Sequence, residues 1–493
     1  MHNLFLRYPN KSIRVFEILI PATSWFIITM PIWLSFYHPA FVAYLIITFD
    51  VYWFYKSVAL VTYALRSFVT YTAHATVNWK QLSSQLPHYN DLYHVVIIPE
   101  YNEPIHILRR TLENLKNQDF PAKRLLVVLA TESKDEKAIE TTMQLIREFQ
   151  DVFYHVLITK HILVRGEISG KSSNMAFAAK AVVAYMKSHA LPFTWTTVTS
   201  CDADALPHSK YFSALSYQFL LDKDREFHFY QGSIMFYNNI WRIPLPNRFM
   251  NTLNSIWNLA VLSQKNRLIN FSTYSLSLQT AIDVGYWSVD VIPEDYHMFF
   301  KVYFAKGEKV EVRPIYLPIL VDAAESHSFL NTFINHYEQN KRWAWGVSDI
   351  PYVIRQAVLT TNIPLLNRFS KISNLLEHHI LWPVNWFLIT IGSAVPSLIN
   401  PQFGRTVLGH NLSRISSGIL TLSTIFLVIV FIIDWRIKPP PPKDYPRWKI
   451  PLLYLQWVTL PFISFFLSAL PGLDAHTRLM LGKRLEYRVT EKV

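Results

Sequence analysis

Residues 94–104 read HVVIIPEYNEP, a short β-branched run closed by proline and asparagine, and residues 107–118 continue with leucines at helical spacing. The same order of strand, turn and helix recurs at RLLVVLATES, residues 124–133. A third run, TWTTVTSCDADALP at 194–207, ends another strand in two acids. Strands that alternate with helices predict a mostly parallel sheet, so we expect an α/β domain.

Polar side chains follow these predicted strands at the points where the strands end. Ligands on parallel sheets bind beyond the carboxyl ends of the strands. The residues expected at that rim are Asn102, Glu103, Glu132, Asp202 and Asp204. Five polar groups at one edge predict a candidate active site.

The composition excludes a wholly soluble protein and also a chain built only of membrane helices. Of 493 residues, 51% are hydrophobic and 17% are charged, while the mean hydropathy of +0.15 is modest. The net charge is +12, and basic excess in a membrane protein gathers in cytoplasmic loops, so we expect a lipid bilayer and no nucleic acid as partner. The single cysteine, Cys201, rules out an internal disulfide.

Apolar runs place the membrane segments at both ends of the chain. Ile18–Phe36 and the run from Ala40 onward predict a helical hairpin, and Ile380–Leu398 and Gly418–Ile433 predict two further spans. A fifth run, Pro451–Pro471, either crosses once or re-enters as a short hairpin. The expected domains are the hairpin at 1–69, the soluble domain at 70–375, the C-terminal helices at 376–475 and a tail at 476–493.

The basic residues give the orientation. Arg7, Lys11 and Arg14 precede the first span, and the stretch RIKPPPPKDYPRWK at 436–449 holds five positive residues and one acid. Both segments are expected on the cytoplasmic side. The prediction is therefore a multi-pass protein of the cell (inner) membrane with a cytoplasmic catalytic domain.

The sequence CDAD sets two carboxylates, Asp202 and Asp204, two residues apart at a strand end. A divalent cation could bridge them and the oxygens of a diphosphate, and hard oxygen ligands suit Mg²⁺ or Mn²⁺. Solvated surface acids give the same pattern. Upstream, GEISGKSSN places Lys171 and Asn174 after a glycine-containing turn at a helix start, which is typical of a phosphate cradle.

Two further motifs each have a structural and a catalytic interpretation. VIPEDYHMFFK sets acids at the opening of an apolar helix, where a carboxylate can cap the helix or act as the base that deprotonates a sugar hydroxyl. EQNKRWAWG fits an aromatic-rich helix at the membrane interface. Its arginine could equally lie beside a leaving diphosphate, with the indole beneath a sugar.

The order of these motifs, IPEYNE, GKSSN, DAD, PED and QNKRW, resembles that of the membrane-integrated family 2 glycosyltransferases, which include cellulose, chitin and hyaluronan synthases. The resemblance covers nearly the whole chain. It implies a Rossmann-like GT-A domain in the cytoplasm fused to a helical transmembrane region, and a nucleotide diphosphate sugar as donor.

The resemblance also implies roles for individual residues. Asp295 looks like the catalytic base, with Glu294 and His297 supporting it, and Gln339 and Trp343 fit the acceptor site. The residues similar to the family's donor-binding and metal-binding groups are Pro99, Tyr101, Glu103, Glu132, Lys171, Asn174, Asp202 and Arg342 for the donor, and Asp202 and Asp204 for the metal. One departure is ATESKD at 130–135, where many members have D-D-x-S. Glu132 is the expected substitute for the aspartate that contacts the base, so a preference for uridine is less secure.

The last residues, YRVTEK, resemble the gating loop of cellulose synthases, which closes over the nucleotide from the cytoplasmic side. The resemblance implies donor contacts from Tyr487, Thr490 and Lys492. A short terminal tail without a fixed structure is the alternative.

These expectations combine into an inverting transferase that makes a β-linked product, with repeated addition and export through the spans. Two hypotheses compete with it. Within the family, the alternative is a single transfer to a lipid or small carbohydrate acceptor. From another class, the alternative is a membrane transporter regulated by nucleotide, although the spans show no internal repeat.

Overall fold

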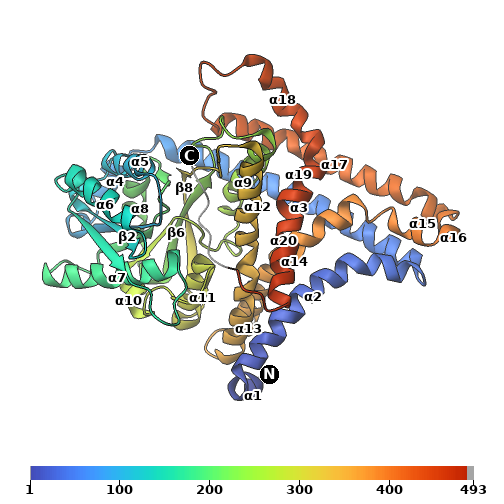
Figure 1. The fold of residues 1–493 in the computed structure, drawn as a ribbon, viewed down its shortest axis with the longest axis horizontal. Coiled ribbons are helices and arrows are strands. Elements are labelled where there is room, and N and C mark those ends of the chain that lie inside the picture. Colours follow the sequence, from blue (N-terminus) through green and yellow to red (C-terminus); the bar gives the residue numbers. More distant parts are fainter. Residues whose placement is uncertain (1, 486–493) are drawn as a thin grey trace.

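A computed structural model describes residues 2–485, in which a helical region lies beside a domain built on a sheet (Figure 1). The sheet of these residues has eight strands in the order β3-β2-β1-β4-β7-β6-β8-β5. The strands are β1 Tyr93–Glu100, β2 Leu125–Glu132, β3 His155–His161, β4 Thr196–Ser200, β5 Leu206–Pro207, β6 His228–Met235, β7 Tyr274–Ser277 and β8 Glu311–Leu320.

The first half of the sheet is parallel. Strands β3, β2, β1 and β4 pair in that order and all run in one direction. In the second half, β7 is antiparallel to β4 and to β6, β6 and β8 are parallel, and β5 is antiparallel to β8. The predicted α/β class is therefore confirmed, and the three strands expected from the sequence correspond to β1, β2 and β4.

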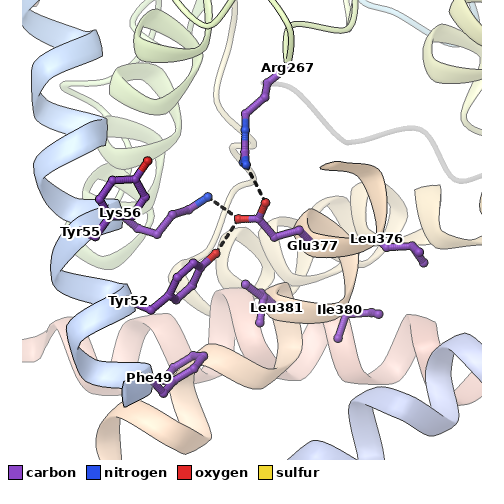
Figure 2. Close-up of a pocket in the computed structure, with 9 residues that line it drawn as sticks. All are labelled: Phe49, Tyr52, Tyr55, Lys56, Arg267, Leu376, Glu377, Ile380 and Leu381. Atoms are coloured by element: carbon purple, nitrogen blue, oxygen red, sulfur yellow. Dashed lines mark hydrogen bonds and ion pairs between the residues drawn. The ribbon is translucent and has the colours of Figure 1, made fainter. Parts of the chain in front are cut away.

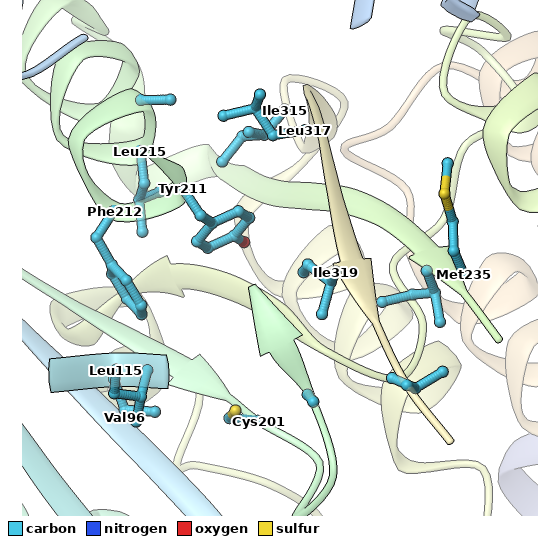
Figure 3. Close-up of a cluster of buried hydrophobic side chains, with 14 of the residues drawn as sticks. Val96, Leu115, Cys201, Tyr211, Phe212, Leu215, Met235, Ile315, Leu317 and Ile319 are labelled. Carbon is cyan, nitrogen blue, oxygen red and sulfur yellow. The ribbon is translucent and has the colours of Figure 1, made fainter. Parts of the chain in front are cut away.

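Helices cover both faces of the sheet because successive residues of a buried strand point to opposite sides. Val96 and Ile98 of β1 belong to a core cluster with side chains of α5 and α8, part of which is shown in Figure 3. Val95 and Ile97 belong to the opposite cluster with α7. The helices of this domain are α4 Trp79–Ser84, α5 Ile105–Lys116, α6 Glu136–Phe149, α7 Lys171–Ser188, α8 Tyr211–Leu221, α9 Leu245–Val261, α10 Leu278–Asp283, α11 Glu294–Lys306, α12 Phe329–Ala344 and α13 Ile350–Leu359.

Short 3₁₀ turns connect these elements. The single cysteine, Cys201, lies directly after β4 and is free and buried. The turns of the sheet domain are η1 Tyr89–Asp91, η2 Ala122–Arg124, η3 Arg225–Phe227 and η4 Trp345–Asp349. Gly232 lies at a register shift between β6 and β8, and a Cβ there would come within 2.8 Å of Ile319. A larger residue at 232 would therefore require the Ile319 side chain to shift.

The helical region consists of two long hairpins and a C-terminal series of short helices. Its elements are α1 His2–Arg7, α2 Pro9–Ser35, α3 Pro39–Thr76, α14 Leu365–Thr390, α15 Val395–Ile399, α16 Pro401–Gly404, α17 Val407–Ile437, η5 Arg447–Lys449, α18 Ile450–Leu455, η6 Gln456–Thr459, α19 Leu460–Ser464, the π-helix η7 Phe465–Ala469 and α20 Leu470–Met480. Within residues 2–485, four helical segments are long and apolar enough to cross a membrane, namely Pro9–Ser35, Pro39–Thr76, Val407–Ile437 and Ile450–Met480. This finding indicates membrane association.

The turns of the two hairpins lie at the same end of the region, away from the sheet (Figure 1). Val42 and Ile46 of α3 pack against Val384 and Leu388 of α14. Ala43 packs with Phe403 of α16 and Leu412 of α17. At the other end, Lys210 of the sheet domain donates hydrogen bonds to carbonyls that end α3.

The expected span Ile380–Leu398 needs correction. The helix in that region, α14, starts at Leu365 and ends at Thr390, and residues 391–394 turn the chain into α15. Glu377, His378 and His379 lie in its middle, and α14 is not among the four segments. The prediction used only the continuous apolar run at 380–398, whereas the helix begins earlier, in polar sequence.

The segment Ile450–Met480 runs crosswise to the hairpins in Figure 1 and packs along α12 and α2. Arg14 of α2 donates hydrogen bonds to the carbonyls of Leu479 at 2.8 Å and Met480 at 2.6 Å. These bonds satisfy carbonyls that the end of α20 leaves open. The chain at residue 480 therefore lies at the end of α2 where that helix begins.

Candidate active site

The candidate site lies at the carboxyl ends of β2, β1 and β4, which are neighbours in the sheet. Glu132 ends β2, Glu100 ends β1, and Asp202 follows β4. Strand β7 is antiparallel to β4, with Ser200 opposite Tyr274, so the residues just before β7 reach the same edge. The parallel order thus brings together acids that are far apart in the sequence, as predicted.

Lys171 is the residue that joins the acidic groups. It is the first residue of α7, and its ammonium lies 2.8 Å from Asp202 Oδ1 and 2.9 Å from Glu294 Oε1. Burial alone would lower the pKa of Lys171, but Asp202, Glu294 and Asp295 together hold it well above its ordinary value. The lysine therefore stays charged and lies among three acids that come from two segments of the chain.

The segment before β7 completes the cluster. Ser272 has a φ of 57°, and its carbonyl accepts a hydrogen bond from Lys171 at 2.8 Å. Its amide donates to Asp295 Oδ2 at 3.0 Å, and its hydroxyl donates to Asp202 Oδ2. Asn270 donates to the Asp295 carbonyl at 3.0 Å. Sequence analysis missed Ser272 and Asn270, because no motif marks the segment and only its place before a strand could have singled it out.

Asp295 has the properties required of a base near neutral pH. Its side chain is partly exposed, yet loss of hydration raises its pKa, and Glu294 adds to the effect. Lys171 and the backbone amides of Ser272 and Tyr296 lower the pKa of Asp295, and the resulting pKa is about 7. A carboxylate with that pKa can both accept and release a proton under physiological conditions.

The two acids of the DAD motif have different partners. Asp202 faces Lys171, whereas Asp204 is buried and accepts a hydrogen bond from the Asp322 amide at 2.7 Å. Within residues 2–485 no group of three or more His, Cys, Asp or Glu side chains is arranged to hold a metal. Two carboxylates with hard oxygens fit a divalent cation only if a ligand supplies the remaining oxygens, and a diphosphate can do so.

Glu132 orders the loop that leads into α7. Its carboxylate is buried and accepts hydrogen bonds from Ser169 Oγ, at 2.8 Å and 3.0 Å, and from the Gly170 amide at 2.8 Å. Gly170 has a φ of 138°, a conformation that favours glycine. The expected helix start at Lys171 is confirmed by α7. Asn174, on the same helix, forms a hydrogen bond with His161 of β3, with 3.0 Å between Oδ1 and Nδ1.

Glu100, which the sequence analysis did not single out, ends β1 between Pro99 and Tyr101. Its side chain is 1% exposed, and burial raises its pKa to about 8. One oxygen accepts a hydrogen bond from the Glu103 amide at 3.1 Å, and the other has no partner among the described residues. Tyr101 is exposed at this rim. The acid at the centre of the motif IPEYNE was the available signal in the sequence.

The other predicted catalytic and acceptor residues lie on adjoining elements. His297 points to Asp349 of η4, with 2.7 Å between Nδ1 and Oδ1. Gln339 of α12 is buried, and its side-chain oxygen has no partner among the described residues. Trp343 packs against Phe236, with ring centroids 5.5 Å apart. Since η4 follows α12 directly and contacts α11, the QNKRW motif is held next to the helix that starts with Glu294 and Asp295.

Arg342 is partly exposed on α12, and its expected contact with the donor stays a prediction. Tyr487, Thr490 and Lys492 of the expected gating loop lie outside the described residues. All the donor, acceptor and catalytic roles given above from resemblance remain predictions, although the structure brings Lys171, Asp202, Glu294 and Asp295 into one cluster.

The sequence from residue 197 to residue 467 matches the family model described as glycosyl transferase family group 2, over more than half of the chain. The chain belongs to this family. The match starts in β4 and includes the DAD, PED and QNKRW motifs. The predicted family 2 relationship, the glycosyltransferase activity and the GT-A fold class are therefore confirmed.

Solved glycosyltransferase structures match this chain at low sequence identity and with TM-scores below 0.5. The mannosyltransferase PcManGT from Pyrobaculum calidifontis, in complex with GDP-Man and Mn²⁺, is 14% identical with a TM-score of 0.43, over 77% of this chain and 100% of that one. S. aureus TarS 1–349, in complex with UDP-GlcNAc, is 13% identical with a TM-score of 0.34, over 68% and 91%. No curated protein matches the sequence.

Substitution of Lys171 tests whether its ammonium compensates the charge of the neighbouring acids. Lys171→Gln leaves three acids without their shared cation, so the pKa of Asp295 should rise and the pH at which transfer reaches half its maximum should move upward by about one unit or more. The KM for donor should rise at least about tenfold, because a diphosphate would meet uncompensated acids. The measurement is kcat/KM against pH.

Two matched variants control this test. Lys180→Gln removes an exposed lysine from the same helix and should change neither quantity. Lys171→Arg keeps the charge and should restore most of the wild-type pH profile. An unchanged profile in Lys171→Gln would contradict the assigned role.

Proposed function

We propose that this glycosyltransferase moves a sugar from a nucleoside diphosphate sugar to an acceptor hydroxyl with inversion at the anomeric carbon. The observation that carries the proposal is the position of Asp295. Its carboxyl has a pKa near 7 and is joined through Ser272 and Lys171 to Asp202, the first acid of the DAD motif. A base and a diphosphate-binding group are thus parts of one hydrogen-bonded cluster.

The chemistry is a single displacement. The acceptor oxygen forms a bond to C1 of the donor sugar while its proton passes to a carboxylate oxygen of Asp295. The bond between C1 and the diphosphate oxygen breaks, and its electron pair leaves with the diphosphate. The Lys171 ammonium stabilises that developing charge. Attack from the opposite face converts an α-linked donor into a β-linked product.

A divalent cation, Mg²⁺ or Mn²⁺, would be held by Asp202 and Asp204 together with diphosphate oxygens. When bound, it supplies positive charge to the leaving diphosphate. Lys171 already faces Asp202, so this chain neutralises the same region with its own side chain. Arg342 and the tail residues Thr490 and Lys492 are proposed as further cationic or hydrogen-bonding contacts to the donor.

For the acceptor we propose a growing carbohydrate chain, made by repeated addition and exported through the helical region as in the synthases that the motifs resemble. Gln339 and Trp343 would hold its end. The alternative is one transfer to a lipid or small acceptor.

The proposed location is a membrane that the chain crosses several times, with the catalytic domain in the cytoplasm. The basic residues Arg7, Lys11 and Arg14, around the start of α2, and those in the segment 436–449 support that orientation. Because the end of α20 is bonded to Arg14 near the start of α2, we propose that Ile450–Met480 lies at the cytoplasmic interface without crossing. That arrangement would leave the terminal residues on the side of the catalytic domain.

Asp295→Asn tests the assigned base. The amide keeps the shape of the side chain but cannot take the proton, so transfer should fall by about 10²-fold or more while donor binding stays within about threefold. In the wild type, kcat/KM should rise with pH through about 7, because only the ionised carboxyl acts as base. The variant should lose this dependence. Asp290→Asn, an exposed aspartate on the preceding loop, is the control and should behave like wild type.

Asp204→Ala tests the metal pair. Without this carboxylate the cation and the diphosphate lose a ligand, so the KM for donor should rise at least about tenfold. Excess chelator should abolish transfer in the wild type, and added Mn²⁺ or Mg²⁺ should restore it. Full activity in excess chelator would show that transfer does not require a metal ion.

Product size separates repeated addition from a single transfer. Purified enzyme is incubated with labelled donor, and the product is sized by gel filtration. The synthase proposal predicts a broad distribution of long chains even at early times, whereas one product of small fixed mass would overturn it.

A further inference from the structure

A cavity of about 450 Å³ lies between α3 and α14, on the side of the helical region next to the sheet domain (Figure 2). This volume falls within the range of ligand pockets. The residues that line it are distinct from the Lys171 cluster. Its charged residues, Lys56, Arg267 and Glu377, come from three separate segments of the chain.

Glu377 forms ion pairs with two basic side chains at once. Its carboxylate lies 2.5 Å from Lys56 Nζ and 2.9 Å from an Arg267 nitrogen, and it accepts a hydrogen bond from the Tyr52 hydroxyl at 2.5 Å. Two positive groups and one negative group leave a net charge of plus one. The Lys56 and Arg267 side chains are 33% and 42% exposed, so both can still contact a ligand. The surplus charge suits one anionic group.

The rest of the cavity is apolar and extends in one direction. Phe49 lies on the same face of α3 as Lys56 but closer to the hairpin turn, and Ile380 and Leu381 follow Glu377 on α14 toward the same turn. Figure 2 shows these three apolar side chains together on one side of the charged group. The cavity is thus charged at the end near the sheet domain and apolar at the end toward the hairpin turns.

This polarity matches an amphiphile and not a water-soluble metabolite. Guanidinium and ammonium groups are the usual partners of phosphate oxygens. A candidate membrane span, α3, forms one wall, so a lipid can bring an acyl chain along Phe49 and Ile380. We propose that this cavity binds one anionic phospholipid, with its phosphate on Lys56 and Arg267 and the start of an acyl chain on the apolar side.

The bound lipid would also act on the segment before β7. Arg267 lies three residues before Asn270, which donates a hydrogen bond to Asp295, and five before Ser272, which contacts both Asp295 and Asp202. A phosphate that holds Arg267 therefore restrains the segment that positions the acidic cluster. The binding site itself does not depend on the proposed reaction.

Native mass spectrometry of the detergent-solubilised full chain tests the binding site directly. The protein is titrated with phosphatidylglycerol and with phosphatidylcholine of the same acyl chains. We expect phosphatidylglycerol to be retained about tenfold more tightly, because phosphatidylcholine carries no net charge. Equal retention of the two lipids would overturn the proposal.

Three variants locate the site. The double variant Lys56→Gln/Arg267→Gln should lose the preference for phosphatidylglycerol, whereas Arg66→Gln, an exposed cation of the same helix, should keep it. Glu377→Gln frees both cations and should keep or strengthen the preference. If Glu377→Gln weakens retention as much as the double variant does, the three residues hold the helices together and do not bind lipid.

Inorganic phosphate distinguishes the source of the anion. Millimolar phosphate should leave phosphatidylglycerol bound, because the free ion lacks the apolar contacts. Displacement of the lipid by phosphate alone would show that the cavity takes a soluble phosphate, and the lipid proposal would fall.

Discussion

The ammonium of Lys171 is the group on which the candidate active site of this glycosyltransferase depends. Three acids gather beyond the strand ends, and like charges at such short separations repel one another strongly when water is largely excluded. A single cation in their midst lets Asp202, Glu294 and Asp295 remain together. The loop that places Lys171 is held in turn by the buried Glu132 at the end of β2, which accepts a hydrogen bond from the Gly170 amide.

Much of the fold could be predicted from the sequence because strands buried on both faces carry continuous β-branched runs. HVVIIPE and LLVVLATE are of this kind, and both became central parallel strands. The parallel order then required their terminal acids to meet at one edge. The start of α7 at Lys171 could also be predicted, since a glycine followed by polar residues and an alanine-rich run marks a helix start.

Other features depend on contacts between distant segments and left no local pattern. Ser272 acts through its backbone and hydroxyl, and its partners become visible only once β7 is paired with β4. Glu100 could be read from the motif, but its burial could not. The start of α14 was missed because Glu377 and its neighbours look soluble, whereas the structure pairs that glutamate with Lys56 and Arg267. A hydropathy average cannot predict such a helix, because it does not register that a charged residue is paired with residues from distant segments.

The most direct test of the central claim is a structure of the full chain with a nucleoside diphosphate and Mn²⁺. The account predicts that the diphosphate lies beyond the carboxyl ends of β1, β2 and β4, with Lys171 in contact with its oxygens and Mn²⁺ against Asp202 or Asp204. Asp295 should remain bonded to the Ser272 amide, facing the space where a sugar would be attached. A nucleotide bound elsewhere, with Lys171 still enclosed by Asp202 and Glu294, would contradict the account.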